Sequence, residues 1–219
     1  MGIGVLMPLP CSGPQLPDIP AVRCRQDAQK LADCCHFVGI DDEILLHEEQ
    51  QGRPYYWVVL HADDTPLCAC HLEQYANLAE SAGDWVGRRA DYMALGWYGG
   101  DCYLLVIELR DILVNERQGE DKLDQLENSI AQILVHLNEQ VTNVAVFNQA
   151  CDQPERYKVA GIVVAPAGIR GISRSNYTRR IENATYSAII TMMPSNRVRD
   201  CRITWSELML TITVADRSS

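Results

Sequence analysis

The sequence lacks any apolar run that approaches the roughly 20 residues a membrane-spanning helix needs. Its apolar N-terminus has no basic segment before it, since the first basic residue is Arg23, and it therefore does not fit a secretory signal peptide. Gly2 stands where a myristoylated glycine would, but position 6 is Leu6 rather than serine or threonine. From these absences we expect a cytoplasmic protein with no membrane partner.

The short motifs of several enzyme classes are also missing. There is no Gly-x-Ser-x-Gly nucleophile elbow and no phosphate-binding loop, and Gly96 to Gly100 fits a hairpin turn better than a dinucleotide fingerprint. No local pattern pairs a histidine with a serine or cysteine nucleophile. The available histidines are His36, His47, His61, His71 and His136.

Positive charge is scarce overall and concentrated in one segment. The net charge of −10 argues against simple non-specific binding of nucleic acid. Residues 170–202, however, hold seven arginines against two acidic residues, a net charge of +5. This asymmetry predicts either a surface for a polyanion or acidic partner, or arginines that pair with the acidic remainder of the chain. The arginines that would contact a phosphate backbone are Arg170, Arg174, Arg179 and Arg180.

The nine cysteines are odd in number and follow no known module spacing. In a chain expected to be cytoplasmic, we expect reduced and mostly buried thiols. Cys34-Cys35-His36 and Cys68-Ala69-Cys70-His71 offer the residue types of a zinc site. Paired cysteines of zinc sites are usually separated by two to four residues, and these are closer, so buried thiols are the favoured interpretation.

The chain divides into a proline-rich arm over residues 1–22 and a single α/β domain over 23–219. Apolar periodicity and turn residues predict a mixed sheet flanked by helices, of α/β or α+β class. Gly99-Gly100 predicts a tight hairpin, and Thr204 to Glu207 resembles a capping box before a final helix or strand. The expected helices are 23–38, 67–81 and 121–138, and the expected strands are 55–61, 91–97, 102–109, 144–147 and 160–164.

An acidic pair stands at the ends of the two hairpin strands. Side chains alternate along a strand, so Glu108 and Arg110 share a face at the end of the second strand. Asp91 opens the first strand, and the short hairpin brings it close to Glu108 across the pair. Two carboxylates, with the main-chain carbonyl of Leu109 as a further ligand, suit Mg²⁺ or Mn²⁺. The structural alternative is that Asp91 caps its strand and Glu108 pairs with an arginine.

The order Asp91, then Glu108-Leu109-Arg110, then a helix with Gln125-Leu126-Glu127, resembles the PD-(D/E)xK nuclease superfamily. The resemblance covers roughly residues 67–165 and implies a restriction-endonuclease-like core. It implies Asp91 and Glu108 as metal ligands and Gln125 as an accessory active-site residue. An upstream helix in this family often adds an acid, which Glu73 or Glu80 would match.

One residue departs from the pattern of that family. Arg110 stands where members usually carry lysine, and an arginine cannot act as a base. It can still stabilise the negative charge of a phosphate.

Two functions follow as hypotheses. The first is a metal-dependent nuclease acting on DNA or RNA, which the resemblance loosely links to phage defence or mobile-element biology. The second is a non-catalytic subunit of a larger nucleoprotein or protein assembly, or a homo-oligomer. This subunit would dock through the proline-rich arm and the arginine-rich segment 170–202, and its metal site would be lost.

Overall fold

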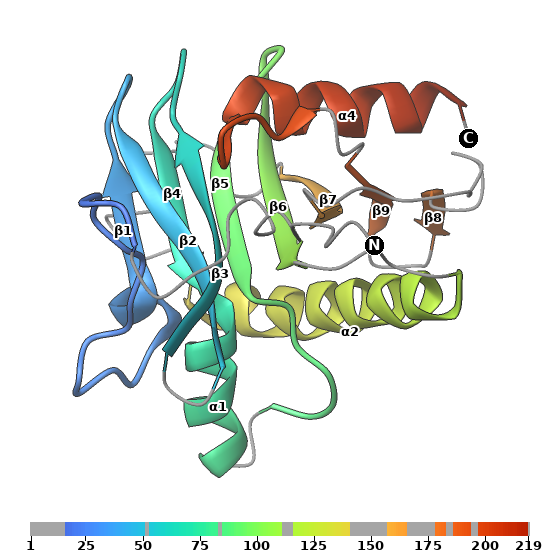
Figure 1. Cartoon of the computed structure of the whole chain (residues 1–219). Helices are drawn as coiled ribbons and strands as arrows, with labels where there is room; N and C mark the ends of the chain where they lie inside the picture. Colours follow the sequence, from blue (N-terminus) through green and yellow to red (C-terminus); the bar gives the residue numbers. More distant parts are fainter. Residues whose placement is uncertain are drawn as a thin grey trace, which may run out of the picture.

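The computed structural model has a seven-stranded mixed sheet at its centre, with helices on both faces (Figure 1). The structure describes residues 16–50, 53–82, 85–110, 116–140, 157–165, 178–182, 186–193 and 197–218. The helices are η1 (Leu31–Cys34, a 3-10 helix), α1 (Leu72–Ala82), α2 (Glu116–Gln140) and α4 (Trp205–Ser218). The strands are β1 (Cys35–Val38), β2 (Glu43–Gln50), β3 (Arg53–His61), β4 (Leu67–His71), β5 (Tyr92–Tyr98), β6 (Asp101–Leu109), β7 (Lys158–Val164), β8 (Thr178–Glu182), β9 (Ser187–Met192) and β10 (Arg202–Thr204). The expected mixed α/β class is thus confirmed.

The large sheet has the strand order β1-β4-β5-β6-β7-β9-β8. Strand β5 runs antiparallel to both of its neighbours, β4 and β6. Strand β7 runs parallel to both of its neighbours, β6 and β9. Consequently β4, β6, β7 and β9 all point the same way and end at one edge, which we call the carboxyl edge. In open α/β sheets this edge is where ligands usually bind.

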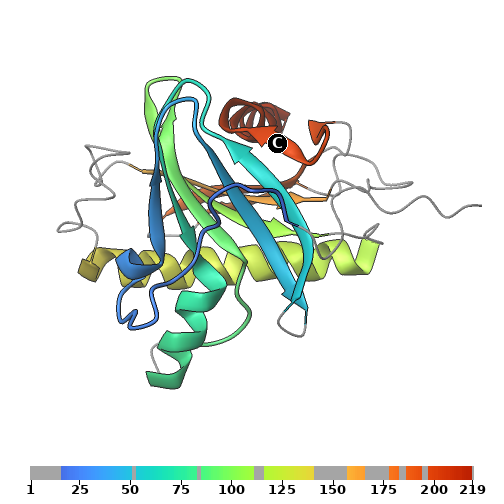
Figure 2. The same ribbon diagram turned by 60° about the vertical axis from the view of Figure 1, so that its left-hand side comes forward.

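Two apolar cores lie on the two faces of the sheet, and β6 contributes to both. Leu104 and Val106 pack on the side of α1 and α2, whereas Leu105 and Ile107 pack on the side of the second sheet and α4. The second sheet has the order β10-β3-β2, and Figure 2 shows its strands beside α4 on this face. Every side chain from Cys102 to Leu109 is buried, which makes β6 a rigid support for whatever stands at its end.

Several sequence predictions are confirmed. Gly99 and Gly100 have φ values of 59° and 88° and form the expected hairpin, with Tyr98 opposite Asp101. The capping box is present: the Glu207 amide donates to Thr204 Oγ1, and the Thr204 amide donates to Glu207 Oε2, both at 3.1 Å. The strand expected over 144–147 lies outside the described residues.

Two predicted helices are wrong in part. Residues 23–38 contain only the short η1 and then β1, which pairs antiparallel with β4. Residues 67–71 are β4, and the helix expected over 67–81 begins only at Leu72. All five side chains of β4 are buried, and periodicity alone cannot distinguish such a short apolar run from a buried helix.

The described end of the N-terminal arm is extended. Ala21 forms a bridge with Leu45 of β2, and Val22 is fully buried in the core on that face. Residues 1–15 lie outside the described part, so the boundary of the arm at residue 22 stays a prediction.

The expectation of reduced thiols is wrong for most of the described cysteines. Cys24 bonds to Cys34 and Cys35 bonds to Cys70, and Cys102 and Cys201 are disulfide-bonded as well. The missed strand β1 explains one bond, because it places Cys35 directly opposite Cys70. Among the described residues Cys68 alone is a free thiol, and it is buried.

In the part of the chain that the structure describes, no helix has the length and apolarity needed to cross a membrane.

Candidate active site

Asp91 and Glu108 meet at the carboxyl edge, as the hairpin predicted. Tyr92 pairs with Ile107 across β5 and β6, so Asp91 follows at the level of Glu108. The Glu108 side chain is on the face that packs against α2, where it contacts Lys122 and Gln125. Asp91 is 7% exposed and Glu108 is 2% exposed, and two carboxylates buried this deeply require compensating partners.

Asp91 is held by main-chain groups on two sides. Its Oδ2 accepts a hydrogen bond of 2.6 Å from the Leu109 amide. Its main-chain carbonyl accepts from the amides of Leu72 and Glu73, at 2.9 and 3.2 Å, at the start of α1. Asp91 therefore joins the end of β6 to the beginning of α1, and Glu73 lies beside it in the first turn of that helix.

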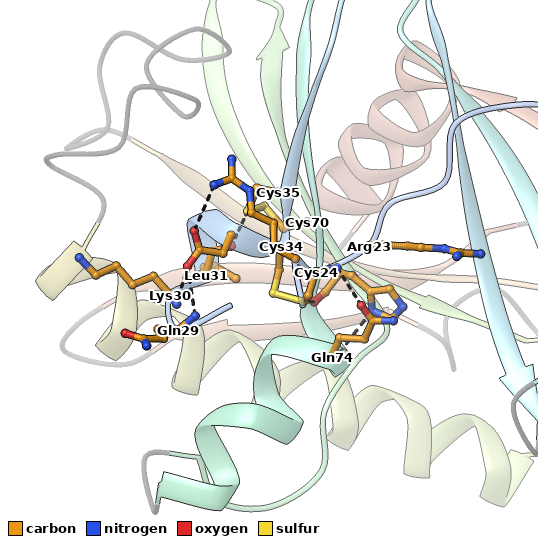
Figure 3. The surroundings of a disulfide bond; sticks show 12 residues. Arg23, Cys24, Gln29, Lys30, Leu31, Cys34, Cys35, Cys70 and Gln74 are labelled. Carbon is orange, nitrogen blue, oxygen red and sulfur yellow. Dashed lines mark hydrogen bonds and ion pairs between the residues drawn. A yellow bond between two sulfur atoms is a disulfide. The ribbon is translucent and has the colours of Figure 1, made fainter. Parts of the chain in front are cut away.

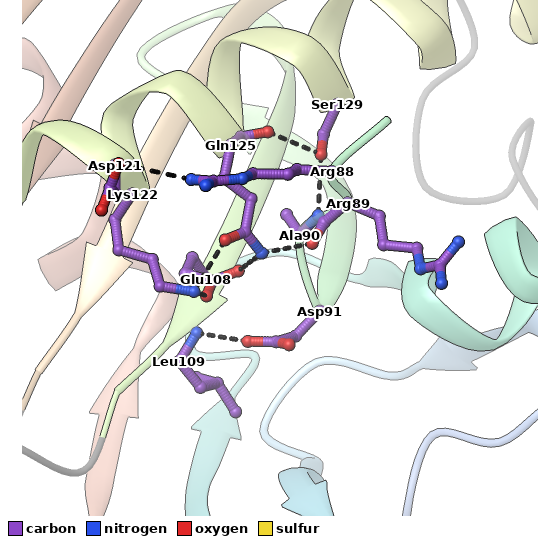
Figure 4. A network of polar contacts seen from close by, with 10 residues as sticks. All are labelled: Arg88, Arg89, Ala90, Asp91, Glu108, Leu109, Asp121, Lys122, Gln125 and Ser129. Atoms are coloured by element: carbon purple, nitrogen blue, oxygen red, sulfur yellow. Dashed lines mark hydrogen bonds and ion pairs between the residues drawn. The ribbon is translucent and has the colours of Figure 1, made fainter. Parts of the chain in front are cut away.

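Helix α2 supplies two polar partners to Glu108 (Figure 4). Lys122 Nζ contacts Glu108 Oε1 and donates to Gln125 Oε1 at 2.7 Å. Gln125 Nε2 donates to Glu108 Oε2 at 2.8 Å and also contacts the main-chain carbonyl of Arg89. Lys122 and Gln125 are three residues apart on the helix, which places them on the same side. Gln125 is thus at the site, as the resemblance implied.

The segment that leads into β5 is fixed by the same helix. Ser129 Oγ accepts a hydrogen bond of 2.7 Å from the Ala90 amide, and Asn128 Nδ2 donates to the Arg88 carbonyl at 2.5 Å. Together with Gln125, these side chains bind main-chain groups of three consecutive residues before Asp91. Helix α2 therefore positions Glu108 directly, and it positions Asp91 by holding the main chain of the residues before it (Figure 4).

The electrostatics of the pair favour a bound cation. Burial and then the neighbouring Glu108 raise the pKa of Asp91 well above its usual range, against the lowering effect of the Leu109 amide. Burial raises the pKa of Glu108 to about 7, although Lys122 and, to a smaller extent, Arg110 oppose this rise. A bound cation would stabilise the ionised carboxylates and would therefore oppose both of these upward shifts.

The donor chemistry fits a hard divalent ion. Asp91 and Glu108 offer carboxylate oxygens from rigid elements, and the Leu109 carbonyl at the same edge stays a predicted ligand. Glu73 acts on the pKa of Asp91 through its charge, which places it within electrostatic reach. An oxygen-only set of this kind suits Mg²⁺ or Mn²⁺.

The remaining predicted site residues are the acidic Glu80 and the basic Arg110. Glu80 forms an ion pair of 2.5 Å with Arg89 near the end of α1, whereas Glu73 acts on Asp91 through its charge. Arg110 follows β6 directly, and its amide donates to the Val164 carbonyl at 2.9 Å.

Two residues of the site were not predicted. Lys122 is one of only three lysines in the chain. Its position beside the apolar stripe of α2 is a sequence feature from which it could have been predicted. Glu48 raises the pKa of both Asp91 and Glu108 by its charge. The sequence does indicate this residue: side chains alternate along β2, and Glu48 is an acid on the face that carries the buried Ile44 and Leu46.

Of the four arginines predicted to contact a phosphate backbone, the two that the structure describes do not share a surface. Arg179 and Arg180 are consecutive in β8 and therefore point to opposite faces. Arg179 pairs with Asp124 and Glu127 of α2, whereas Arg180 pairs with Asp216 of α4. This pairing matches the alternative in which arginines neutralise the acidic remainder. Arg170 and Arg174 lie outside the described residues.

No family model matches the chain, and the searches of curated proteins and of solved structures also find no match. The resemblance to the PD-(D/E)xK superfamily consequently stays a prediction that depends on the residues described above.

Proposed function

We propose that the protein is a metal-dependent phosphodiesterase that hydrolyses DNA or RNA at the Asp91–Glu108 site. One observation supports this most strongly: two buried carboxylates, a lysine and a glutamine meet at the carboxyl edge of the sheet. Lys122, which contacts Glu108, would take the place of the lysine that the family usually carries where this chain has Arg110.

Each residue would have a distinct role. Asp91 and Glu108 would hold Mg²⁺ or Mn²⁺, with Glu73 as a further acidic ligand. When bound, such an ion polarises a phosphoryl oxygen and lowers the pKa of a bound water. Lys122 would hold the attacking water or stabilise developing negative charge, and Gln125 would orient Glu108. Arg110, at the same edge, would attract the phosphate.

A cleavage assay with matched variants tests this proposal. Labelled single- and double-stranded DNA and RNA are incubated with the wild type, Glu108→Gln, Lys122→Met and Asp101→Asn, with Mg²⁺ or Mn²⁺. Asp101 is the control, because it lies at the hairpin end of β6, about 23 Å from Glu108 along the strand.

We expect the Glu108 and Lys122 variants to lose about 10²- to 10³-fold in cleavage rate, since each removes a charge aimed at the transition state. The Asp101 variant should keep the wild-type rate. Cleavage that survives in Glu108→Gln would refute the assignment of this site.

A second candidate is the non-catalytic subunit of an assembly with protein or nucleic acid. The ion pairs of Arg179 and Arg180 favour it, because they leave these arginines less available for a phosphate backbone. If no substrate is cleaved and no divalent ion stabilises the protein, this candidate replaces the first. Homo-oligomerisation and the expected cytoplasmic location stay predictions, and the disulfide bonds weigh against a reducing compartment for the form described here.

A further inference from the structure

Three cysteine sulfur atoms meet between β1 and β4, away from the carboxylate site. Cys35 of β1 bonds to Cys70 of β4, which lies directly opposite it. Cys68 is two residues before Cys70 and therefore on the same face of β4. Figure 3 shows the Cys24–Cys34 bond beside the Cys35–Cys70 bond.

The spacing of one pair of these atoms matches a tetrahedral thiolate site, and the bonded pair Cys35–Cys70 would reach such a spacing once its bond is reduced. The Sγ atoms of Cys35, Cys68 and Cys70 all lie within 4.8 Å of one another, and those of Cys68 and Cys70 are 3.9 Å apart. Zinc–sulfur bonds of about 2.3 Å in a tetrahedron place neighbouring sulfur atoms about 3.8 Å apart. Cys68 and Cys70 therefore already stand at the separation that such an ion requires.

Cysteine sulfur atoms are ligands that suit a soft metal such as zinc. Cys68 and Cys70 are fully buried in the apolar core that also contains Leu31 and Cys34. A zinc ion deprotonates its thiol ligands outright.

We propose that Cys35, Cys68 and Cys70 form a redox-controlled zinc site. A dithiol reductant breaks the Cys35–Cys70 bond, gives one hydrogen atom to each sulfur, and is itself oxidised to a disulfide. Zn²⁺ then displaces the three thiol protons and binds three thiolates. Water or a thiol from the reduced Cys24–Cys34 pair completes the tetrahedron. This proposal is independent of the phosphodiesterase activity.

The site would keep the same two strands joined in both redox states. In the oxidised chain β1 and β4 are linked by the disulfide bond, and in the reduced chain by the metal. A protein expected in a reducing compartment would thereby retain this link without its disulfide.

Metal binding by the full chain tests the proposal directly. The protein is prepared once with its disulfides intact and once after reduction and removal of the reductant, and each form is equilibrated with Zn²⁺ and desalted. Bound zinc is measured by elemental analysis, and Co²⁺ titration reports thiolate ligation through its sulfur-to-metal charge-transfer absorption. Cys68→Ser is the decisive variant, because it leaves both disulfides in place in the oxidised chain. Cys201→Ser is the control from outside the cluster, and it is compared in the reduced chain only, because Cys201 is disulfide-bonded in the oxidised chain.

We expect one zinc per reduced chain and none per oxidised chain. Cys68→Ser should weaken Zn²⁺ binding at least tenfold, whereas Cys201→Ser should bind as the wild type does. The proposal is overturned if reduced protein binds no zinc, if oxidised protein binds it equally, or if Cys68→Ser has no effect.

Discussion

The carboxylate pair should make the stability of the metal-free protein fall as the pH rises. In the unfolded chain Glu108 has its ordinary pKa of 4.5, and in the folded protein burial raises that pKa to about 7. Below pH 4.5 the group is protonated in both states and contributes no penalty. Between these values the folded state keeps a proton that the unfolded state loses, so the free energy of unfolding falls by about 1.4 kcal/mol per pH unit. The total loss from Glu108 is about 3 kcal/mol and is complete above pH 7, and Asp91 adds a loss of the same sign.

Urea unfolding from pH 4.5 to 8 in the presence of a chelator measures this effect. Glutamine cannot titrate, so the stability of the wild type minus that of Glu108→Gln should decrease by about 3 kcal/mol across the window. The comparison uses the slope of the free energy of unfolding against pH, so a constant effect of the substitution on the Lys122 contact cancels. Asp101→Asn, which alters a far more exposed carboxylate, should follow the wild-type slope. Parallel curves for the wild type and Glu108→Gln would refute the reasoning.

Three further predictions concern single side chains. Ser129→Ala should cost about 1–3 kcal/mol in urea unfolding, because it leaves the buried Ala90 amide without its acceptor; unchanged stability would contradict this role. Thr204→Ala should cost about 1 kcal/mol through loss of the cap on α4, measured by thermal unfolding, and an unchanged melting temperature would show that the cap contributes nothing. Arg110→Lys should change the cleavage rate by less than about tenfold, because Lys122 already supplies the cation beside Glu108; a larger change would make Arg110 the essential charge.

The carboxylate pair could be predicted from the sequence because its position depends on local rules. A two-glycine turn sets the hairpin register, and alternation along β6 then assigns Glu108 to one face. The apolar stripe of α2, with Leu123 and Leu126 buried, likewise follows from a helical period.

The partners of that pair could not be predicted in the same way. Lys122 borders the apolar stripe of α2, and either border of such a stripe can face the sheet edge. Only the docking of the helix decides which one does.

The N-terminal region escaped prediction for a related reason. Residues 23–38 have apolar residues at helical spacing, but intrinsic propensity is a weak preference that tertiary contacts override. Here the partner of β1 is β4, and the disulfide bond that joins them links residues separated by 35 positions in the sequence.

That bond also bears on how two molecules of this chain can meet. Strand β1 lies at the outer margin of the seven-stranded sheet, and such strands are the ones that exchange between molecules in domain-swapped dimers. While Cys35 is bonded to Cys70 within one chain, β1 cannot leave its own sheet to complete that of a neighbour. Exchange of this strand is therefore possible only in the reduced chain, so the redox state of Cys35 and Cys70 decides whether this margin of the sheet stays within one molecule or is shared by two.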